Sequence, residues 1–246
     1  MAKIRLDKYI TMCGNYTRTQ AKKLIHQKRV TVGGLIVTDE GFKADENSEN
    51  ICIDGIPAVG EKYTYIMLNK PAGVISATDD KKHRTVLDLI GEDVKRDDLF
   101  PAGRLDIDTE GLLILTNDGV FAHNTLSPKK HVKKVYLVHA ENYKYSEESR
   151  QRFLNGIEID GGYICKGAVL ELIEETPEYT ALKLEITEGK FHQVKRMIAA
   201  EGGNVIYLKR LSFGRITLDE SLRPGEYRRL NAEEMQYIKE RNGDKT

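Results

Sequence analysis

The chain has 246 residues, which is enough for one larger domain or two unequal ones around a substantial core. Hydrophobic residues make up 40% and charged residues 31%, and no run of about 18 apolar residues occurs, so we expect a globular, cytoplasmic protein with neither a membrane span nor a secretory signal. Three scattered cysteines (Cys13, Cys52 and Cys165) lack metal-ligand spacing, and no glycine-rich phosphate loop occurs, so we expect no cofactor and no zinc site.

Basic residues are concentrated at the start of a chain whose formal net charge is +0. Residues 1–29 hold eight lysines and arginines against one acidic residue, Asp7. Such asymmetry indicates a basic module that binds a polyanion, although solvated helix faces can be equally basic.

Two short helices and a hairpin are predicted within the first 50 residues. The first helix ends at Gly14-Asn15 and is marked by apolar residues at helical spacing: Leu6, Tyr9, Ile10 and Cys13. Thr17 or Thr19 can cap the second helix through its hydroxyl group. Residues 30–32 and 35–37 are β-branched or apolar runs on either side of a Gly-Gly turn, which predicts a hairpin.

This amino-terminal segment resembles the S4 RNA-binding module, with Arg5-Leu6-Asp7 at its head and the run 28–32 at the exit of the second helix. We place the module at residues 1–56 and a linker at 57–62, in the glycine- and proline-containing stretch 54–62. The alternative is a small capping subdomain. The resemblance implies that one helix face contacts RNA phosphates, which gives affinity and register rather than base identity. That face carries Arg18, Lys22 and Lys23.

The remaining chain, residues 63–240, contains many strands and few helices, which predicts an α+β domain built on a mixed or antiparallel sheet, with a tail at 241–246. Strands are predicted at 63–68, 112–115, 135–138, 157–159, 168–173, 179–186, 205–211 and 216–218. Helices are predicted at 86–90, at 146–153, from the segment 188–197 to the glycines at 202–203, and near 231–240.

A polar stretch stands directly before the predicted strand 112–115. It carries an arginine, two carboxylates and a threonine between two glycines: Gly103, Arg104, Asp106, Asp108, Thr109 and Gly111. This composition suits neither a helix nor a core, and a loop placed by a buried strand is a common position for functional residues. An ordinary polar turn is the alternative.

The run Gly-Arg-Leu-Asp-x-x-Thr-x-Gly-Leu-Leu at 103–113 resembles the signature loop of the pseudouridine synthases. Further stretches are similar to other motifs of this family, in the same order along the chain: Asn69 to Gly73, Lys134-x-Tyr136, Glu188 to Met197, and Leu218 to Arg228. The resemblance implies a cofactor-free isomerisation of uridine in RNA. It implies that Asp106 is the catalytic residue, that Tyr136 lies against the target base, and that Lys195 pairs with Asp106.

The residue types suit this chemistry. Breaking the N1–C1′ bond of uridine and joining C5 to C1′ needs no redox step, but it needs an ionised carboxylate as nucleophile or base. A cation beside Asp106 keeps that carboxylate charged, although many family members carry arginine at the position of Lys195. The target uridine must also leave its stack. The expected RNA contacts are Arg104, Arg18, Lys22, Lys23, Lys134, His192 and Arg196.

Three stretches are similar to the branch that acts on the small ribosomal subunit: Asp106 to Thr109, Phe191 to Met197 and the closing segment from Leu218. Most relatives that act on the large subunit carry a pair other than Phe191-His192 before the glutamine. We therefore predict a monomeric enzyme whose partner is small-subunit (16S) ribosomal RNA, either naked or in an assembling subunit. One alternative is a synthase for large-subunit (23S) RNA, and a second is a non-catalytic ribosome-assembly factor, which the intact site disfavours. A glycosidase-like pair of Asp106 and Asp108 is disfavoured because the chain has no tryptophan to bind sugar.

Overall fold

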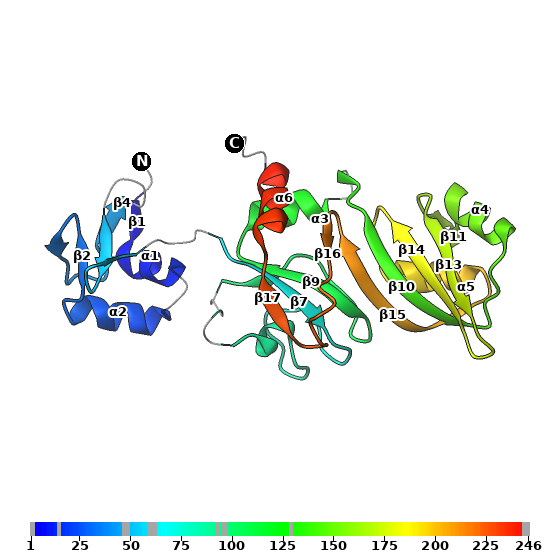
Figure 1. The fold of residues 1–246 in the computed structure, drawn as a ribbon, viewed down its shortest axis with the longest axis horizontal. Coiled ribbons are helices and arrows are strands. Elements are labelled where there is room, and N and C mark those ends of the chain that lie inside the picture. Colours follow the sequence, from blue (N-terminus) through cyan, green and yellow to red (C-terminus); the bar gives the residue numbers. More distant parts are fainter. Residues whose placement is uncertain are drawn as a thin grey trace. The chain divides into compact units, whose positions relative to one another are not determined.

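The computed structural model describes residues 3–13, 16–45, 50–58, 63–91, 94, 98–127 and 130–242. The chain divides into two compact units, residues 1–64 with 90–99 and residues 65–89 with 100–246 (Figure 1). Within the described ranges, no helix is long and apolar enough to cross a membrane.

The smaller unit packs two helices and two small antiparallel sheets around one apolar core. Its elements are β1 (Lys3–Arg5), α1 (Leu6–Met12), α2 (Arg18–His26), β2 (Val30–Val32), β3 (Leu35–Ile36), β4 (Lys43–Asp45), β5 (Ile51–Ile53) and β6 (Ile56–Pro57). The strands pair as β1-β4 and as β3-β2-β5-β6. The core is formed by buried residues of both helices and the strands, among them Leu6, Ile10, Leu24, Ile25, Val30 and Ile51.

The predicted cap of the second helix is confirmed at Thr17. Its hydroxyl accepts a hydrogen bond from the Gln20 amide at 3.3 Å, and the Gln20 side chain accepts one from the Thr17 amide at 2.8 Å. This reciprocal capping box satisfies two donors at the helix start. The linker prediction is wrong at Pro57, because β6 pairs with β5 there and completes the sheet. Gly14-Asn15 and residues 59–62 lie outside the described residues.

The larger unit is built on a nine-stranded sheet in the order β13-β14-β10-β15-β9-β7-β17, with β8 paired to β9 and β16 paired to β15. Its strands are β7 (Tyr65–Lys70), β8 (Phe100–Pro101), β9 (Glu110–Thr116), β10 (Lys134–Glu141), β13 (Val169–Glu175), β14 (Thr180–Ile186), β15 (Asn204–Phe213), β16 (Ile216–Thr217) and β17 (Tyr227–Arg229). Only β15 and β9 pair in parallel among the described strands, so the predicted mixed sheet is confirmed. A separate two-stranded sheet joins β11 (Glu158–Ile159) to β12 (Tyr163–Ile164).

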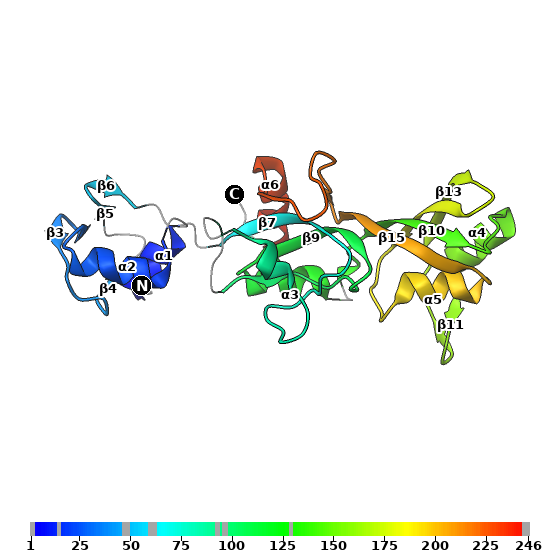
Figure 2. The ribbon, with the colours of Figure 1, turned by 90° about the horizontal axis from the view of Figure 1, so that it is seen from below.

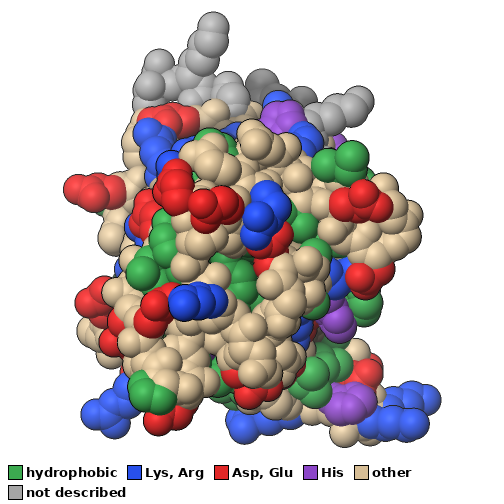
Figure 3. Space-filling view, turned by 90° about the vertical axis from the view of Figure 1, so that its right-hand side faces the viewer, with side chains coloured by type: hydrophobic (Ala, Val, Ile, Leu, Met, Phe, Trp, Pro, Cys, Tyr) green, Lys and Arg blue, Asp and Glu red, His purple; other side chains and the backbone are tan. Residues whose placement is uncertain are grey.

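The helices of this unit are α3 (Gly119–Leu126), α4 (Glu147–Asn155), α5 (Gln193–Ala200) and α6 (Ala232–Asn242), with a short 3-10 helix, η1 (Val86–Leu89). Helix α5 lies against β15, beside the β11–β12 hairpin (Figure 2). Helix α4 packs on β13, and this end of the sheet carries acidic and basic side chains interspersed with apolar ones (Figure 3).

Two helix predictions differ from the structure. Helix α5 begins at Gln193 rather than near 188, because His192 has a left-handed backbone with φ of +49° and interrupts the helical path. Helix α3 was not predicted. It is capped by Asp118, directly before its first residue, whose buried carboxylate accepts hydrogen bonds from the amides of Val120 and Phe121.

The close approach of β9 and β15 depends on Gly111. This glycine pairs with Arg210 and has φ of +99°, and a Cβ atom added there would lie 2.3 Å from the Arg210 carbonyl oxygen. No other residue fits this position without moving the backbone. The glycine after the polar loop therefore brings the loop next to β15.

Candidate active site

The polar loop between β8 and β9 is held by hydrogen bonds to its backbone. The Ser76 hydroxyl donates to the Leu105 carbonyl at 2.9 Å and accepts from the Leu105 amide at 3.0 Å. The Gly73 amide donates to the Ile107 carbonyl at 2.7 Å, and the Thr109 amide donates to the Asp106 carbonyl at 3.1 Å. The segment predicted as a functional loop is thus fixed on both sides of Asp106.

Lys70 is the main anchor of this loop. Its side chain is fully buried at the end of β7, and its Nζ donates to the carbonyls of Asp106 at 3.0 Å and Thr109 at 2.9 Å, as well as to Pro71. Burial lowers the pKa of Lys70 to about 8, although nearby Asp108, Asp106 and Glu110 oppose that shift. Sequence analysis noted the motif but gave Lys70 no role. The signal was a lysine that closely follows the apolar run 65–68.

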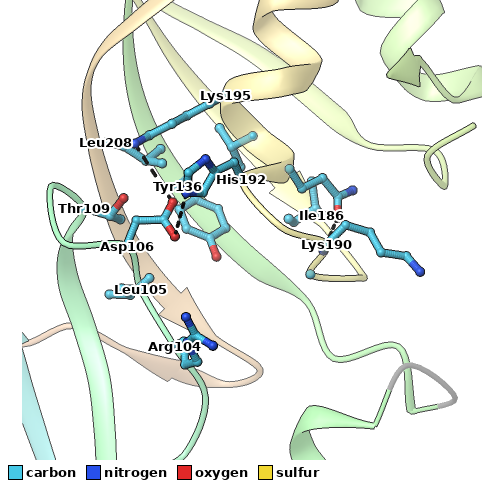
Figure 4. Close-up of a pocket in the computed structure, with 13 residues that line it drawn as sticks. Arg104, Leu105, Asp106, Thr109, Tyr136, Ile186, Lys190, His192, Lys195 and Leu208 are labelled. Carbon is cyan, nitrogen blue, oxygen red and sulfur yellow. Dashed lines mark hydrogen bonds and ion pairs between the residues drawn. The ribbon is translucent and has the colours of Figure 1, made fainter. Parts of the chain in front are cut away.

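A pocket opens beside Asp106 and collects side chains from distant parts of the sequence (Figure 4). The loop supplies Asp106, β10 supplies Tyr136, and α5 supplies Lys195. The structure therefore brings together the three residues that were expected to be catalytic. The lining is Arg104, Leu105, Asp106, Thr109, Tyr136, Ile186, Gly189, Lys190, His192, Gln193, Val194, Lys195 and Leu208.

Lys195 makes its shorter contacts with Asp108 rather than with Asp106. Its Nζ lies 2.6 and 2.7 Å from the two Asp108 carboxylate oxygens and 4.0 Å from Oδ2 of Asp106. The Lys195 hydrogen bond holds the pKa of Asp108 below its usual value. On the other side, Nε2 of His192 lies 3.6 Å from Oδ1 of Asp106. Asp106 thus lies between a lysine and a histidine, and its side chain is one-third exposed.

Tyr136 forms part of an otherwise apolar wall. It is buried in the middle of the sheet, where it pairs with Leu184 on β14 and Arg210 on β15. Ile186 and Leu208 line the same pocket, and sequence analysis had given neither a role. The buried Oγ1 of Thr109 also lies there and has no hydrogen-bond partner in the described part of the chain. A flat ring with polar edges suits such a cavity.

The expected RNA contacts fall into two groups. Arg104 is exposed at the pocket, and Arg18 and Lys23 are exposed on α2, where Lys22 pairs with Glu40 at 3.0 Å. Lys134 and Arg196 are instead engaged within the protein. The Lys134 ammonium donates to the Val132 carbonyl and lies over the Phe213 ring, and Arg196 binds Asp160. Burial lowers the pKa of Lys134 to about 8, with a smaller contribution from Arg210.

Comparisons with known proteins agree with both units. A family model described as RNA pseudouridylate synthase matches residues 64–200, and an S4 domain model matches residues 4–50. The chain is 43% identical over 234 residues to ribosomal small subunit pseudouridine synthase A of Escherichia coli (strain K12), covering 94% of this chain and 98% of that protein. It is 44% identical over 237 residues to the uncharacterized RNA pseudouridine synthase YtzG of Bacillus subtilis, covering 96% and 99%. A crystal structure of a pseudouridylate synthase matches with a TM-score of 0.65 and 37% identity, covering 96% and 99%.

Proposed function

The chain belongs to the RNA pseudouridylate synthase family and carries an amino-terminal S4 domain, and we propose that it converts a specific uridine of small-subunit ribosomal RNA to pseudouridine. The observation that supports this activity is the pocket in which Asp106, Tyr136 and Lys195 meet. The small-subunit target is supported by the near full-length similarity to a relative named for that subunit. The intact site favours an enzyme over a non-catalytic assembly factor.

We propose that the target uridine leaves its stack and enters the pocket, with its base against Tyr136 and between Ile186 and Leu208. Extruding a nucleotide costs a few kcal/mol, and contacts with the apolar wall offset that cost. Arg104 is exposed beside the pocket. We assign it the role of filling the space that the base leaves or of holding the distorted backbone. The unpaired Thr109 hydroxyl is available to hydrogen bond with the bound nucleotide.

The proposed chemistry assigns the central step to the Asp106 carboxylate. It either attacks C1′ or abstracts a proton, so that the N1–C1′ bond breaks and the base can turn and join C5 to C1′. C5 loses one hydrogen and N1 gains one, so the product is an isomer of the substrate and no co-reactant is consumed. Lys195 and His192 lie beside the carboxylate and stabilise its charge. We assign to the hydroxyl of Tyr136, which lines the same pocket, a part in removing the C5 proton.

The proposal is tested by mapping pseudouridine in ribosomal RNA from cells with and without this protein. We expect one position in small-subunit RNA to lose the modification and to regain it when the gene is restored. The purified protein should then modify that position in a transcript or in an assembling subunit, and comparing the two identifies the substrate form. Loss of a site only in large-subunit RNA would contradict the target, and no loss at all would contradict the activity.

Charge reversal on α2 should weaken RNA binding and make it less sensitive to salt. Arg18→Glu with Lys23→Glu removes two exposed cations from the proposed phosphate-binding face. The slope of log affinity against log salt should become shallower by the amount expected for the loss of about two phosphate contacts. The matched control is Lys144→Glu with Lys239→Glu, which changes the net charge equally at exposed positions of the larger unit. Equal slopes in the two double variants would show that α2 is only solvated.

The buried anchor Lys70 should give the activity an alkaline limit. Because the pKa of Lys70 is about 8, its ammonium is charged below that pH and binds the loop carbonyls most strongly there. We expect the rate to fall as the pH rises through about 8 and this limb to disappear in Lys70→Met, which should be slow at every pH. Lys134→Gln is the control, since the pKa of Lys134 is also about 8.

The stability of the fold should rise with pH above about pH 8, where the rate is expected to fall. The folded protein releases the Lys70 proton at lower pH than the ordinary lysine value of 10.5, so the unfolded chain binds more protons between about pH 8 and that value. The free energy of unfolding should therefore rise with pH in that interval. Denaturant titrations at several pH values separate this behaviour from alkaline unfolding. In the rate measurements, an alkaline limb that disappears in Lys134→Gln but persists in Lys70→Met would show that the limb comes from Lys134.

A further inference from the structure

Phe191 is an exposed aromatic residue next to the pocket. The residue is 73% exposed, although burying a phenylalanine normally stabilises a protein. It directly precedes His192, which lines the pocket and lies 3.6 Å from Asp106. Single exposed apolar residues are common on protein surfaces, so it is the position of this ring beside the candidate active site that points to a contact made when the substrate binds.

The Phe191 ring already forms part of a stack. It lies over the His192 imidazole with the ring centroids 3.8 Å apart and the planes inclined by 18°. The imidazole covers one face of the phenyl ring, and the large exposed fraction requires that the other face is open. Phe191 therefore stacks directly on His192, the side chain that lies beside the Asp106 carboxylate, and its open face points away from His192.

Several contacts hold the segment that presents this ring. The left-handed backbone of His192 turns the chain sharply before α5, and an Arg196 guanidinium nitrogen donates to the Phe191 carbonyl at 3.4 Å. The Lys190 amide donates to the Gln193 side chain at 2.9 Å, and the Lys190 ammonium lies 4.6 Å from the ring centre of Tyr163 on the β11–β12 hairpin. The backbone that carries the ring is thus held in place before any ligand arrives, and the His192 imidazole packs on the ring, which lowers the entropic cost of binding.

We propose that the open face of Phe191 stacks on the base of the nucleotide next to the extruded uridine. This inference rests on the proposed RNA substrate. When the uridine leaves its stack, its neighbour loses a stacking partner on one side, and an aromatic ring at the pocket can replace it. Every base has a π-face, so Phe191 contributes affinity and register and accepts any neighbour.

A chemical double-mutant cycle tests the contact. Three single-stranded RNA nonamers with the same sequence and one central uridine are the probes. The first is unmodified, the second has an abasic residue directly 5′ of the uridine, and the third has one directly 3′ of it. One abasic substitution should weaken binding to the full-length wild-type protein by about 5-fold to 100-fold. The same substitution should change binding to Phe191→Leu, which keeps an apolar side chain without a π-face, by less than about 2-fold.

Two control variants accompany this cycle. Phe191→Tyr should behave as the wild type because it keeps the ring, and Ile173→Ala should behave as the wild type because Ile173 is an exposed apolar residue on β13 rather than in the pocket. An abasic penalty of equal size in the wild type and in Phe191→Leu would overturn the proposal. So would a loss of activity in Phe191→Leu that occurs only on assembling subunits, because the ring would then contact a ribosomal protein.

The outcome can be distinguished from failure of the proposed target. If small-subunit ribosomal RNA is not modified but the abasic penalty still depends on Phe191, the stacking role stands and only the target is wrong. If that RNA is modified at equal rates by the wild type and Phe191→Leu, and the oligonucleotide affinities also agree, the target stands and the stacking role is wrong.

Discussion

Asp106→Asn should abolish pseudouridine formation, lowering the single-turnover rate by at least about 10⁴-fold. The amide keeps the shape of the side chain but has neither the charge nor the nucleophilicity that both versions of the proposed step require. The surrounding loop should keep its conformation, because Lys70, Gly73 and Ser76 bind its backbone rather than the Asp106 side chain. RNA affinity should therefore stay within a few-fold of the wild type, as measured by filter binding.

Asp108→Asn is the matched control for this variant. Asp108 lies two residues further along the same loop, and its side chain is 64% exposed. Its carboxylate binds Lys195 but has no chemical step assigned to it, so the rate should stay within about tenfold of the wild type. Without Asp108, the Lys195 ammonium is free to move closer to Asp106. An active Asp106→Asn enzyme would refute the mechanism, and an inactive Asp108→Asn enzyme would support a two-carboxylate site.

Lys195→Met should lower the rate by about 10²-fold to 10³-fold and leave RNA affinity within a few-fold. It should also move the acidic limb of the pH–rate profile upward, because a carboxylate that loses a neighbouring cation holds its proton more strongly. Lys195→Arg should restore much of the rate, since the charge remains. The pH–rate profile under single-turnover conditions measures both effects.

A double variant separates the two carboxylates that Lys195 contacts. Lys195→Met also leaves Asp108 without the hydrogen bond that lowers its pKa, so a shifted limb has two possible sources. Lys195→Met combined with Asp108→Asn removes the second source. If the limb remains shifted upward in the double variant, Lys195 acts on Asp106. A limb that returns to the wild-type position would show that Lys195 serves only to neutralise Asp108.

The parts of this molecule that were predictable from sequence are those that local pattern determines. The apolar run at 112–115 and the glycines around it correctly indicated a buried strand after a polar loop, and the Thr17 cap followed from a hydroxyl before a helical repeat. The predicted helix over 86–90 is confirmed as the short 3-10 helix η1. In each case, residues close in sequence provide the deciding interactions.

The errors and omissions depend on contacts between distant segments. The role of Lys70 requires the loop carbonyls some 36 to 39 residues away, and Leu208 enters the pocket only because β15 lies between β10 and β9. Whether Lys195 lies closer to Asp106 or to Asp108 depends on how α5 faces the loop. Local pattern carries no information on such distances, and β6 was missed because a Gly-Ile-Pro run is equally typical of a linker.

The pairing of β17 with β7 has a consequence for how the protein is made. Strand β7 emerges early from the ribosome, yet one of its two edges has no partner until residues 227–229 have been synthesised. The closing segment also binds Asn69, the neighbour of Lys70, through the Leu222 carbonyl and through the backbone of Gly225 and Glu226. The nascent chain therefore carries an open strand edge from the synthesis of β7 until that of β17, the condition under which aggregation competes with folding. The strand that carries Lys70 gains its second neighbour only when residues 227–229 arrive.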